Sequence, residues 1–212
     1  MSARLRWVAG QFSRPRGWAG RLFIGPWLDR IGAGMNRLTL AQLEVQPGDS
    51  VLEVGFGGGG LLAMILAATE GEVTGVDLSE AMVARARRRF AKVPRLRLEV
   101  GSVDALPLPD ASVDKACSVN NIYFWPDPGA AMAELARVIR PGGRLAIAFE
   151  PPEELRKWPG HRFGFRLFEE AEVRRLMIEA GFTEIGRAEG RGRMPDRFLC
   201  LTGERVSSEA AS

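Results

Sequence analysis

The feature that most constrains the fold of this chain is a run of glycines placed directly after a short apolar segment. Ser50–Val54 is followed by Gly55-Phe56-Gly57-Gly58-Gly59-Gly60, and a second apolar segment, Glu72–Val76, leads into Asp77. Glycine permits positive φ and close approach of the backbone to a ligand. A strand, a glycine-rich turn, a helix and a second strand ending in an acid form a nucleotide-type cofactor site in an α/β sheet, where the acid accepts hydrogen bonds from ribose hydroxyls.

Strand and helix patterns alternate along most of the chain, which predicts a doubly wound, mostly parallel sheet. The last two strands have no helix between them, and the loop-like link Glu189–Pro195 predicts an antiparallel hairpin. We expect Pro141-Gly142-Gly143 to end a helix and Pro151–Gly164 to form an irregular insertion. The predicted strands are Ser50–Val54, Glu72–Val76, Leu96–Val100, Val113–Val119, Arg144–Phe149, Phe182–Ala188 and Arg197–Thr202, and the predicted helices are Trp27–Leu43, Gly58–Thr69, Glu80–Lys92, Pro128–Ile139 and Glu169–Ala180.

The length of 212 residues suits one folding unit. We expect an N-terminal helical arm or lid over residues 1–46, a cofactor-binding domain over 47–204 and a flexible tail over 205–212. Cys117 and Cys200 have no metal or redox spacing, which indicates a reducing compartment and no metal site. No run is apolar enough to span a bilayer, and no apolar signal segment is visible, so we expect a cytoplasmic protein.

The arm mixes aromatic and apolar residues with arginines, and Pro15 and Pro26 interrupt any single helix. Two interpretations stay open: a lid over the active site, or contact with an anionic membrane surface. The residues concerned are Trp7, Phe12, Trp18, Leu22, Phe23, Trp27, Leu28 and Ile31.

The glycine pattern alone leaves two cofactor classes open. Gly55-x-Gly57-x-x-Gly60 followed by Asp77 matches the dinucleotide fingerprint of NAD(P)-dependent oxidoreductases. Those enzymes need a proton relay such as Tyr-x-x-x-Lys, but the single tyrosine, Tyr123, is followed four residues later by Asp127. Glu53 before the first glycine, the successive glycines and the C-terminal hairpin favour S-adenosylmethionine instead.

Several blocks in order make the chain, from about Pro47 to Thr202, resemble a class I S-adenosylmethionine-dependent methyltransferase. It is most similar to the small-molecule branch that includes the ubiquinone/menaquinone and sterol methyltransferases. The blocks are Val51-Leu52-Glu53-Val54-Gly55-Phe56-Gly57-Gly58-Gly59, Val76-Asp77-Leu78-Ser79-Glu80-Ala81-Met82, Leu106-Pro107-Leu108-Pro109-Asp110-Ala111-Ser112-Val113-Asp114, Glu134-Leu135-Ala136-Arg137-Val138-Ile139-Arg140-Pro141-Gly142-Gly143 and Glu179-Ala180-Gly181-Phe182.

The resemblance implies a cofactor contact for each matching residue. Glu53 would orient the methionine ammonium, and the backbone at Gly55 and Gly57 would lie against the methionine and sugar. Asp77 would bind the ribose hydroxyls, with Leu78 and Met82 beside the adenine. Where the family has Gly-Asp-Ala this chain has Gly101-Ser102-Val103, so the usual acidic contact to adenine is absent and Ser102 replaces it. A backbone group of Asn120 would also meet the cofactor.

A methyl group on a sulfonium is already electrophilic, so positioning and desolvation supply much of the acceleration without an obligatory catalytic side chain. Our candidates are Tyr123, which orients the acceptor or relays a proton, and His161, a general base in the insertion. Tyr123 as a wall-lining aromatic and His161 as a surface-loop residue are the competing interpretations. Glu150 ends the fifth strand, where it either faces the pocket or is an ordinary strand-end carboxylate.

The predicted reaction is in-line methyl transfer to a small molecule, and the alternative acceptor is a phospholipid amine or a prenylated quinone at a membrane. No Asn/Asp-Pro-Pro-Tyr/Phe motif follows the fourth strand, which argues against nucleic-acid amino groups as acceptors. The basic run on the second helix and the turn after it would suit phosphates or a solvated helix face. That run contains Arg85, Arg87, Arg88, Arg89, Lys92, Arg95 and Arg97.

Overall fold

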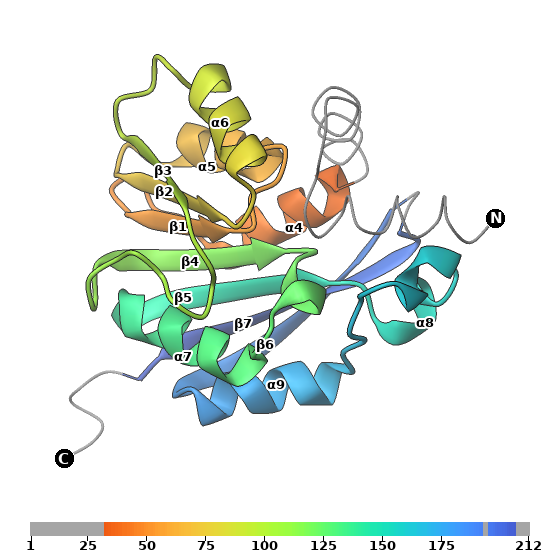
Figure 1. The fold of residues 1–212 in the computed structure, drawn as a ribbon. Coiled ribbons are helices and arrows are strands. Elements are labelled where there is room, and N and C mark those ends of the chain that lie inside the picture. The colour runs from red at the N-terminus through yellow and green to blue at the C-terminus, as the bar shows by residue number, and fades with distance from the viewer. Residues whose placement is uncertain (1–31, 193–194, 207–212) are drawn as a thin grey trace.

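The computed structural model describes residues 32–192 and 195–206, and its seven strands form one sheet (Figure 1). The strand order is β3-β2-β1-β4-β5-β7-β6. The first five strands are parallel, whereas β7 runs antiparallel to both β5 and β6. This confirms the predicted doubly wound sheet with a C-terminal hairpin. The strands are β1 Val51–Val54, β2 Val73–Asp77, β3 Leu96–Val100, β4 Val113–Val119, β5 Ile139–Phe149, β6 Phe182–Arg191 and β7 Arg197–Arg205.

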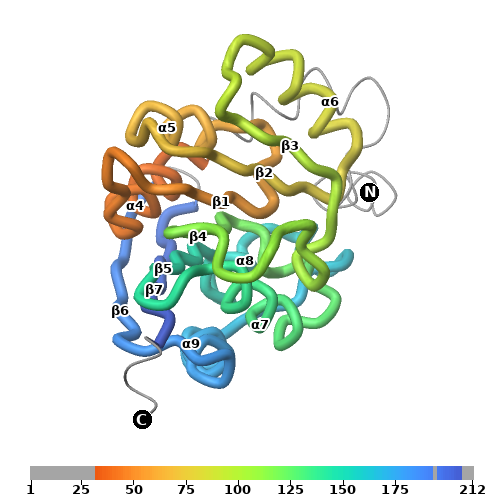
Figure 2. Tube along the Cα trace, turned by 90° about the vertical axis from the view of Figure 1, so that its left-hand side faces the viewer, coloured from red at the N-terminus to blue at the C-terminus, as the bar shows by residue number. Residues whose placement is uncertain are grey.

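Helices cover both faces of the sheet (Figures 1 and 2). One face carries α4 (Ala33–Leu43), α5 (Gly60–Ala68) and α6 (Glu80–Arg89), and the other carries α7 (Pro128–Val138) and α9 (Glu170–Glu179). Each face has its own cluster of buried apolar side chains, as expected for strands buried on both sides. The short helices η2 (Ile122–Phe124), α8 (Pro152–Leu155) and η3 (Pro159–Arg162) follow the carboxyl ends of β4 and β5.

Local sequence signals set the helix starts. The Ser79 side chain accepts a hydrogen bond from the Met82 amide at 3.4 Å and caps α6. Asp127 caps α7 by accepting from the amides of Gly129 and Ala130, and Pro128 occupies the first turn, where its missing N–H costs nothing.

Three boundaries differ from the prediction. Pro141-Gly142-Gly143 lies inside β5 and not between a helix and a later strand, because β5 already begins at Ile139. The pairing of β5 with β4 shifts register between Val113 and Lys115. The predicted loop Glu189–Pro195 begins too early in the chain, because β6 continues to Arg191. The insertion expected to be irregular contains α8 and η3. The N-terminal part of the predicted helix Trp27–Leu43, up to residue 31, lies outside the described residues, as do arm residues Trp7 to Ile31.

Arginines of the basic run on α6 and the following turn bind the chain's own carbonyl groups. Arg87 donates to the Leu98 carbonyl at 2.6 Å, Arg89 to the Gly58 carbonyl at 2.6 Å, and Arg95 to the carbonyls of Gly71 and Leu66. These guanidinium groups fasten α6 and the next turn to neighbouring loops. The contacts favour a structural role for this run over phosphate binding.

Arg137 on α7 holds the loop that precedes β4. It donates to the carbonyls of Leu106 and Leu108 at 3.1 and 2.9 Å and to the carboxylates of Glu134 and Asp110, both at 2.7 Å. Glu134 in turn accepts from the Leu106 amide at 2.8 Å, and its hydrogen bond with Arg137 lowers the pKa of its carboxyl. The block that begins at Leu106 and the block that begins at Glu134 are distant in the sequence, but they meet in one hydrogen-bonded cluster.

Arg137→Met should lower the free energy of unfolding by about 1–3 kcal/mol, because it leaves two loop carbonyls and two carboxylates without their donor. Arg175→Met is the matched control, since Arg175 makes an exposed helix pair with Glu179 and its loss should cost less than about 0.5 kcal/mol. Urea unfolding of both variants measures the difference. Equal losses would contradict the structural role assigned to Arg137.

Candidate active site

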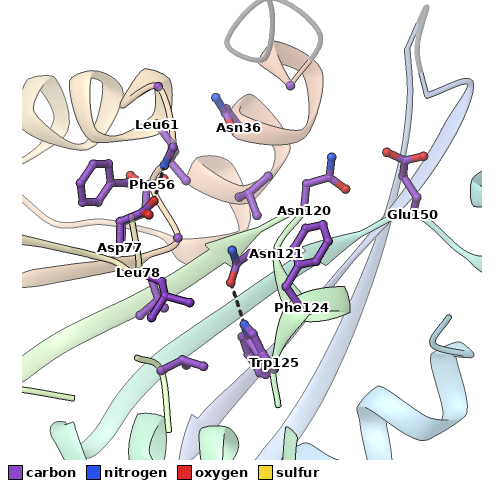
Figure 3. Close-up of a pocket in the computed structure, with 18 of the residues that line it drawn as sticks. Asn36, Phe56, Leu61, Asp77, Leu78, Asn120, Asn121, Phe124, Trp125 and Glu150 are labelled. Atoms are coloured by element: carbon purple, nitrogen blue, oxygen red, sulfur yellow. Dashed lines mark hydrogen bonds between the residues drawn. The ribbon is translucent and has the colours of Figure 1, made fainter. Parts of the chain in front are cut away.

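A cavity of about 500 Å³ opens at the carboxyl ends of the parallel strands (Figure 3). This volume lies within the range of ligand sites. The cavity is next to the point where the strand order reverses between β1 and β4, which is where open α/β sheets bind ligands. Its walls come from the glycine turn, the ends of β2 to β5, the start of α4 and the insertion after β5.

The glycine turn between β1 and α5 has a backbone that only glycine adopts easily. Gly55, Gly57 and Gly59 have φ of +73°, +49° and +78°. A Cβ on Gly55 would lie 2.3 Å from the Asn121 side chain, so the first glycine is required for packing. A Cβ on Gly57 would meet nothing within 4 Å, so the second glycine leaves open space beside the cavity that a ligand can use.

Asp77 ties this turn to the end of β2. One carboxylate oxygen accepts from the Gly57 amide at 2.9 Å, and the other accepts from the Ser79 amide at 2.8 Å. Burial raises the pKa of Asp77, and the two amide hydrogen bonds oppose that rise. A carboxylate oxygen can accept a second hydrogen bond. The group that fixes the turn can therefore also accept bonds from a ligand in the cavity.

The structure places around this cavity all nine residues to which the sequence assigned a cofactor contact. Among the apolar residues of this set, Leu78 is the one whose exposure indicates a ligand surface, because its large side chain lines the cavity and is 43% exposed. An exposed leucine beside buried Met82 offers an apolar surface to a flat ring. The nine are Glu53, Gly55, Gly57, Asp77, Leu78, Met82, Ser102, Val103 and Asn120. Their individual contacts stay predictions.

The other part of the cavity combines aromatic rings with a carboxyl group. Phe124, Trp158 and Phe165 line it, with ring centroids 4.6 Å apart for Phe124 and Phe165 and 5.3 Å apart for Trp158 and Phe165. Glu150 follows β5 directly and also lines it, so the interpretation in which this carboxyl faces the pocket fits the structure. Asn120, at the end of β4, has φ of +55° and points its side chain into the same region (Figure 3).

Burial raises the pKa of Glu150 to about 7, and the nearby charge of Glu154 adds to the rise. A hydrogen bond from the Asn120 side chain opposes it. Lys157 holds Glu154 with Nζ 2.8 Å from both carboxylate oxygens, and it also contacts Asp196 at 3.1 Å. These contacts join the insertion to the end of the β6–β7 hairpin at the edge of the cavity.

Neither of the two candidate catalytic residues is among the described residues that line the cavity. The Tyr123 ring is buried against Phe165, its hydroxyl accepts a hydrogen bond from the Glu150 amide, and burial raises the pKa of its phenol. The His161 Nδ1 lies 2.7 Å from the Trp158 carbonyl. Tyr123 therefore packs behind the lining residue Phe165 without lining the cavity itself, and His161 lies in the insertion as the loop interpretation expects; both catalytic assignments stay predictions.

Other lining residues carried no motif that would have singled them out. Gly32 and Asn36 come from the start of α4, and Lys157 and Asp196 come from segments far apart in the sequence. Asn36 is largely buried although it is polar, and it shares the buried face of α4 with Met35, Thr39 and Leu43, so no sequence pattern singled it out.

Comparison with known proteins shows the family to which the chain belongs. Residues 52–147 match the methyltransferase domain family. An uncharacterized methyltransferase of Bacillus subtilis, YdaC, is 40% identical over 120 residues, which is 56% of this chain and 66% of that protein. The 27-O-demethylrifamycin SV methyltransferase of Amycolatopsis mediterranei is 34% identical over 139 residues, which is 61% of this chain and 51% of that protein. These matches thus span about half to two thirds of the relatives' length.

The solved structure of a geranyl diphosphate methyltransferase in complex with S-adenosylmethionine has a TM-score of 0.72, with 18% identity, and the match covers 93% of this chain and 94% of that one. At this identity the likeness shows the fold. The sequence matches, taken with the glycine-turn geometry, identify the chain as an S-adenosylmethionine-dependent methyltransferase. Within the described ranges, no helix is both long and apolar enough to cross a membrane.

Gly57→Val should abolish binding of S-adenosylhomocysteine while reducing stability by only about 1–2 kcal/mol, the cost of positive φ for a residue with a Cβ. Gly55→Val is the contrasting variant, because its Cβ would also overlap Asn121. Calorimetric titration and thermal unfolding of both variants separate the two effects. Undiminished binding by the Gly57 variant would mean that the ligand lies elsewhere.

Glu150→Gln should make the protein more stable above pH 7, by on the order of 2 kcal/mol, and leave it nearly unchanged at pH 4. The sign follows from the raised pKa of Glu150, about 7 in the folded chain against an ordinary 4.5. As pH rises through this interval the unfolded chain releases the proton first, so wild-type stability falls and stays lower above pH 7. Urea unfolding at pH 4, 6 and 8 measures this, and parallel pH curves would refute it.

Proposed function

We propose that this protein transfers a methyl group from S-adenosylmethionine to a small-molecule acceptor by in-line displacement. The observation that carries the proposal is one cavity with two chemically different parts. The glycine turn and Asp77 line one part, and aromatic rings with Glu150 line the other. When bound, the cofactor supplies a methyl group on a positively charged sulfur, which a nucleophile attacks from the opposite side.

The residues of the first part fit the cofactor. The Asp77 carboxylate would accept hydrogen bonds from the ribose hydroxyls while its existing bonds to the Gly57 and Ser79 amides keep it in place. Leu78 and Met82 offer the apolar wall for the adenine, and Ser102 lies where the usual acid is missing. Glu53, buried at the end of β1, supplies a carboxylate for the methionine ammonium.

The residues of the second part would orient the acceptor and exclude water. Phe124, Trp125 and Trp158 supply flat apolar surface, and Trp125 is held by donating from Nε1 to the Asn121 side-chain oxygen at 2.7 Å. Fixing the acceptor in line with the transferred methyl group converts binding into rate acceleration. The Amycolatopsis relative, whose name describes methylation of a demethylated rifamycin, supports a small organic acceptor.

The choice between a dissolved acceptor and a lipid or prenylated quinone depends on arm residues 1–31, which the structure does not describe. We place a dissolved small molecule first, because the described cavity is sufficient to seat one. A cytoplasmic location is part of the proposal, and two free, buried cysteines, Cys117 and Cys200, support it. Membership of the methyltransferase family argues against an NAD(P)-dependent oxidoreductase.

Asp77→Ala should weaken binding of S-adenosylhomocysteine by about 1–3 kcal/mol, because charge-assisted hydrogen bonds to the ribose and the anchor of the glycine turn are both lost. Asp104→Ala is the matched control, since Asp104 is close in sequence but is not among the described cavity-lining residues. Calorimetric titration with S-adenosylhomocysteine, with NADH in a parallel cell, measures both variants. Binding of NADH alone by the wild type would overturn the proposed function.

A further inference from the structure

Glu150 faces the second part of the cavity and is held there through its backbone, because its amide donates to the Tyr123 hydroxyl. The Asn120 side chain favours the ionised form of the Glu150 carboxyl and so lowers its pKa. Because Tyr123 is packed against Phe165, the anchor for the Glu150 backbone is itself rigid. In Figure 3 the side chain of Asn120 lies directly above Phe124, and the Glu150 side chain is drawn beside it.

Glu150 makes no ion pair with any described residue, whereas its neighbour Glu154 does. Glu154 is compensated by Lys157, which contacts both of its oxygens and Asp196 as well. Asn120 is neutral, and its Oδ1 is buried with no hydrogen-bond partner among the residues described.

We propose that Glu150 takes the proton from the methyl acceptor, that Asn120 positions its carboxylate, and that the acceptor is a phenol or an enol bound between the aromatic walls. This inference rests on the proposed function. The acceptor oxygen passes its proton to Glu150 and forms the new bond to the methyl carbon with the electron pair it gains. The carbon–sulfur bond breaks with its pair on sulfur, which becomes a neutral thioether, and Glu150 later releases the proton to water.

The chemistry of the cavity favours a hydroxyl attached to a flat unsaturated body. An amine can attack with its lone pair and lose a proton afterwards, whereas a hydroxyl becomes a strong nucleophile as its proton leaves. The pKa of a phenol is about 10, so a carboxylate that titrates near neutrality is a better matched base than an ordinary one. The rings of Phe124, Phe165 and Trp158 supply the packing surface that an aromatic acceptor prefers.

The first test needs no turnover. 4-Nitrophenol is titrated with pH while bound to the protein loaded with S-adenosylhomocysteine, and its ionisation is followed by absorbance. A carboxylate beside the hydroxyl disfavours the phenolate, so the midpoint in wild type should be at least about one pH unit higher than in Glu150→Gln. Glu153→Gln is the matched control, because Glu153 forms an exposed pair with Arg197. Equal midpoints in wild type and Glu150→Gln would overturn the proposal.

The second test uses methyl transfer to a panel of simple phenols. Glu150→Gln should lose about 10²- to 10⁴-fold in kcat and lose the rise of rate with pH near 7, with affinity for S-adenosylhomocysteine unchanged within about twofold. Asn120→Gly keeps the positive φ of this position but removes the amide that lowers the pKa of Glu150. It should therefore move the rate profile to higher pH, which a purely structural loss would not do.

The outcomes separate this inference from the function on which it depends. Wild-type protein that binds S-adenosylhomocysteine but no phenol would overturn the acceptor class and leave the methyltransferase proposal intact. Wild-type protein that binds no S-adenosylhomocysteine would overturn both. A Glu150→Gln variant with an unchanged kcat and pH profile would remove Glu150 from the reaction while the cofactor site stands.

Discussion

The site depends on the hydrogen bonds that the buried Asp77 carboxylate accepts from the Gly57 and Ser79 amides. Desolvation makes a buried charge costly, and two amide donors offset that cost. The result is a glycine turn held open at the end of β1 before any ligand arrives. A preorganised turn lowers the conformational cost of binding, because its unusual φ angles are already set by the fold.

Arginine side chains on two helices hold the glycine turn and a second loop in place. Arg89 holds the Gly58 carbonyl from α6, and Arg137 holds the Leu106–Asp110 loop from α7. Gly55 leaves room for Asn121, which in turn accepts from Trp125. These contacts connect the cofactor part of the cavity to its aromatic part, so a change at the first glycine would disturb both.

The acceptor part owes its chemistry to burial. Glu150 would be an ordinary carboxylate in water, but the apolar surroundings at the end of β5 and the charge of Glu154 raise its pKa to about 7. Tyr123, which the sequence suggested as a catalytic group, accepts a hydrogen bond from the Glu150 backbone amide and so supports the segment that carries this carboxylate. His161 lies beside the Trp158 carbonyl in the insertion. A tyrosine and a loop histidine are equally compatible with catalysis and with packing, so residue type alone could not decide the role of either one.

The sequence by itself determined the sheet class and the glycine turn, and its resemblance to a known family implied which residues surround the cofactor part of the cavity. The sheet class and the turn follow from short-range rules: glycine where φ is positive, an acid at a strand end, and alternating apolar segments. Only the tertiary structure decided that β5 begins at Ile139, that Arg87, Arg89 and Arg95 bind carbonyls, and that Glu150, Asn120 and Lys157 meet at one cavity. Pairing partners, desolvation and the approach of distant segments depend on how the chain packs in space, and no local pattern encodes them.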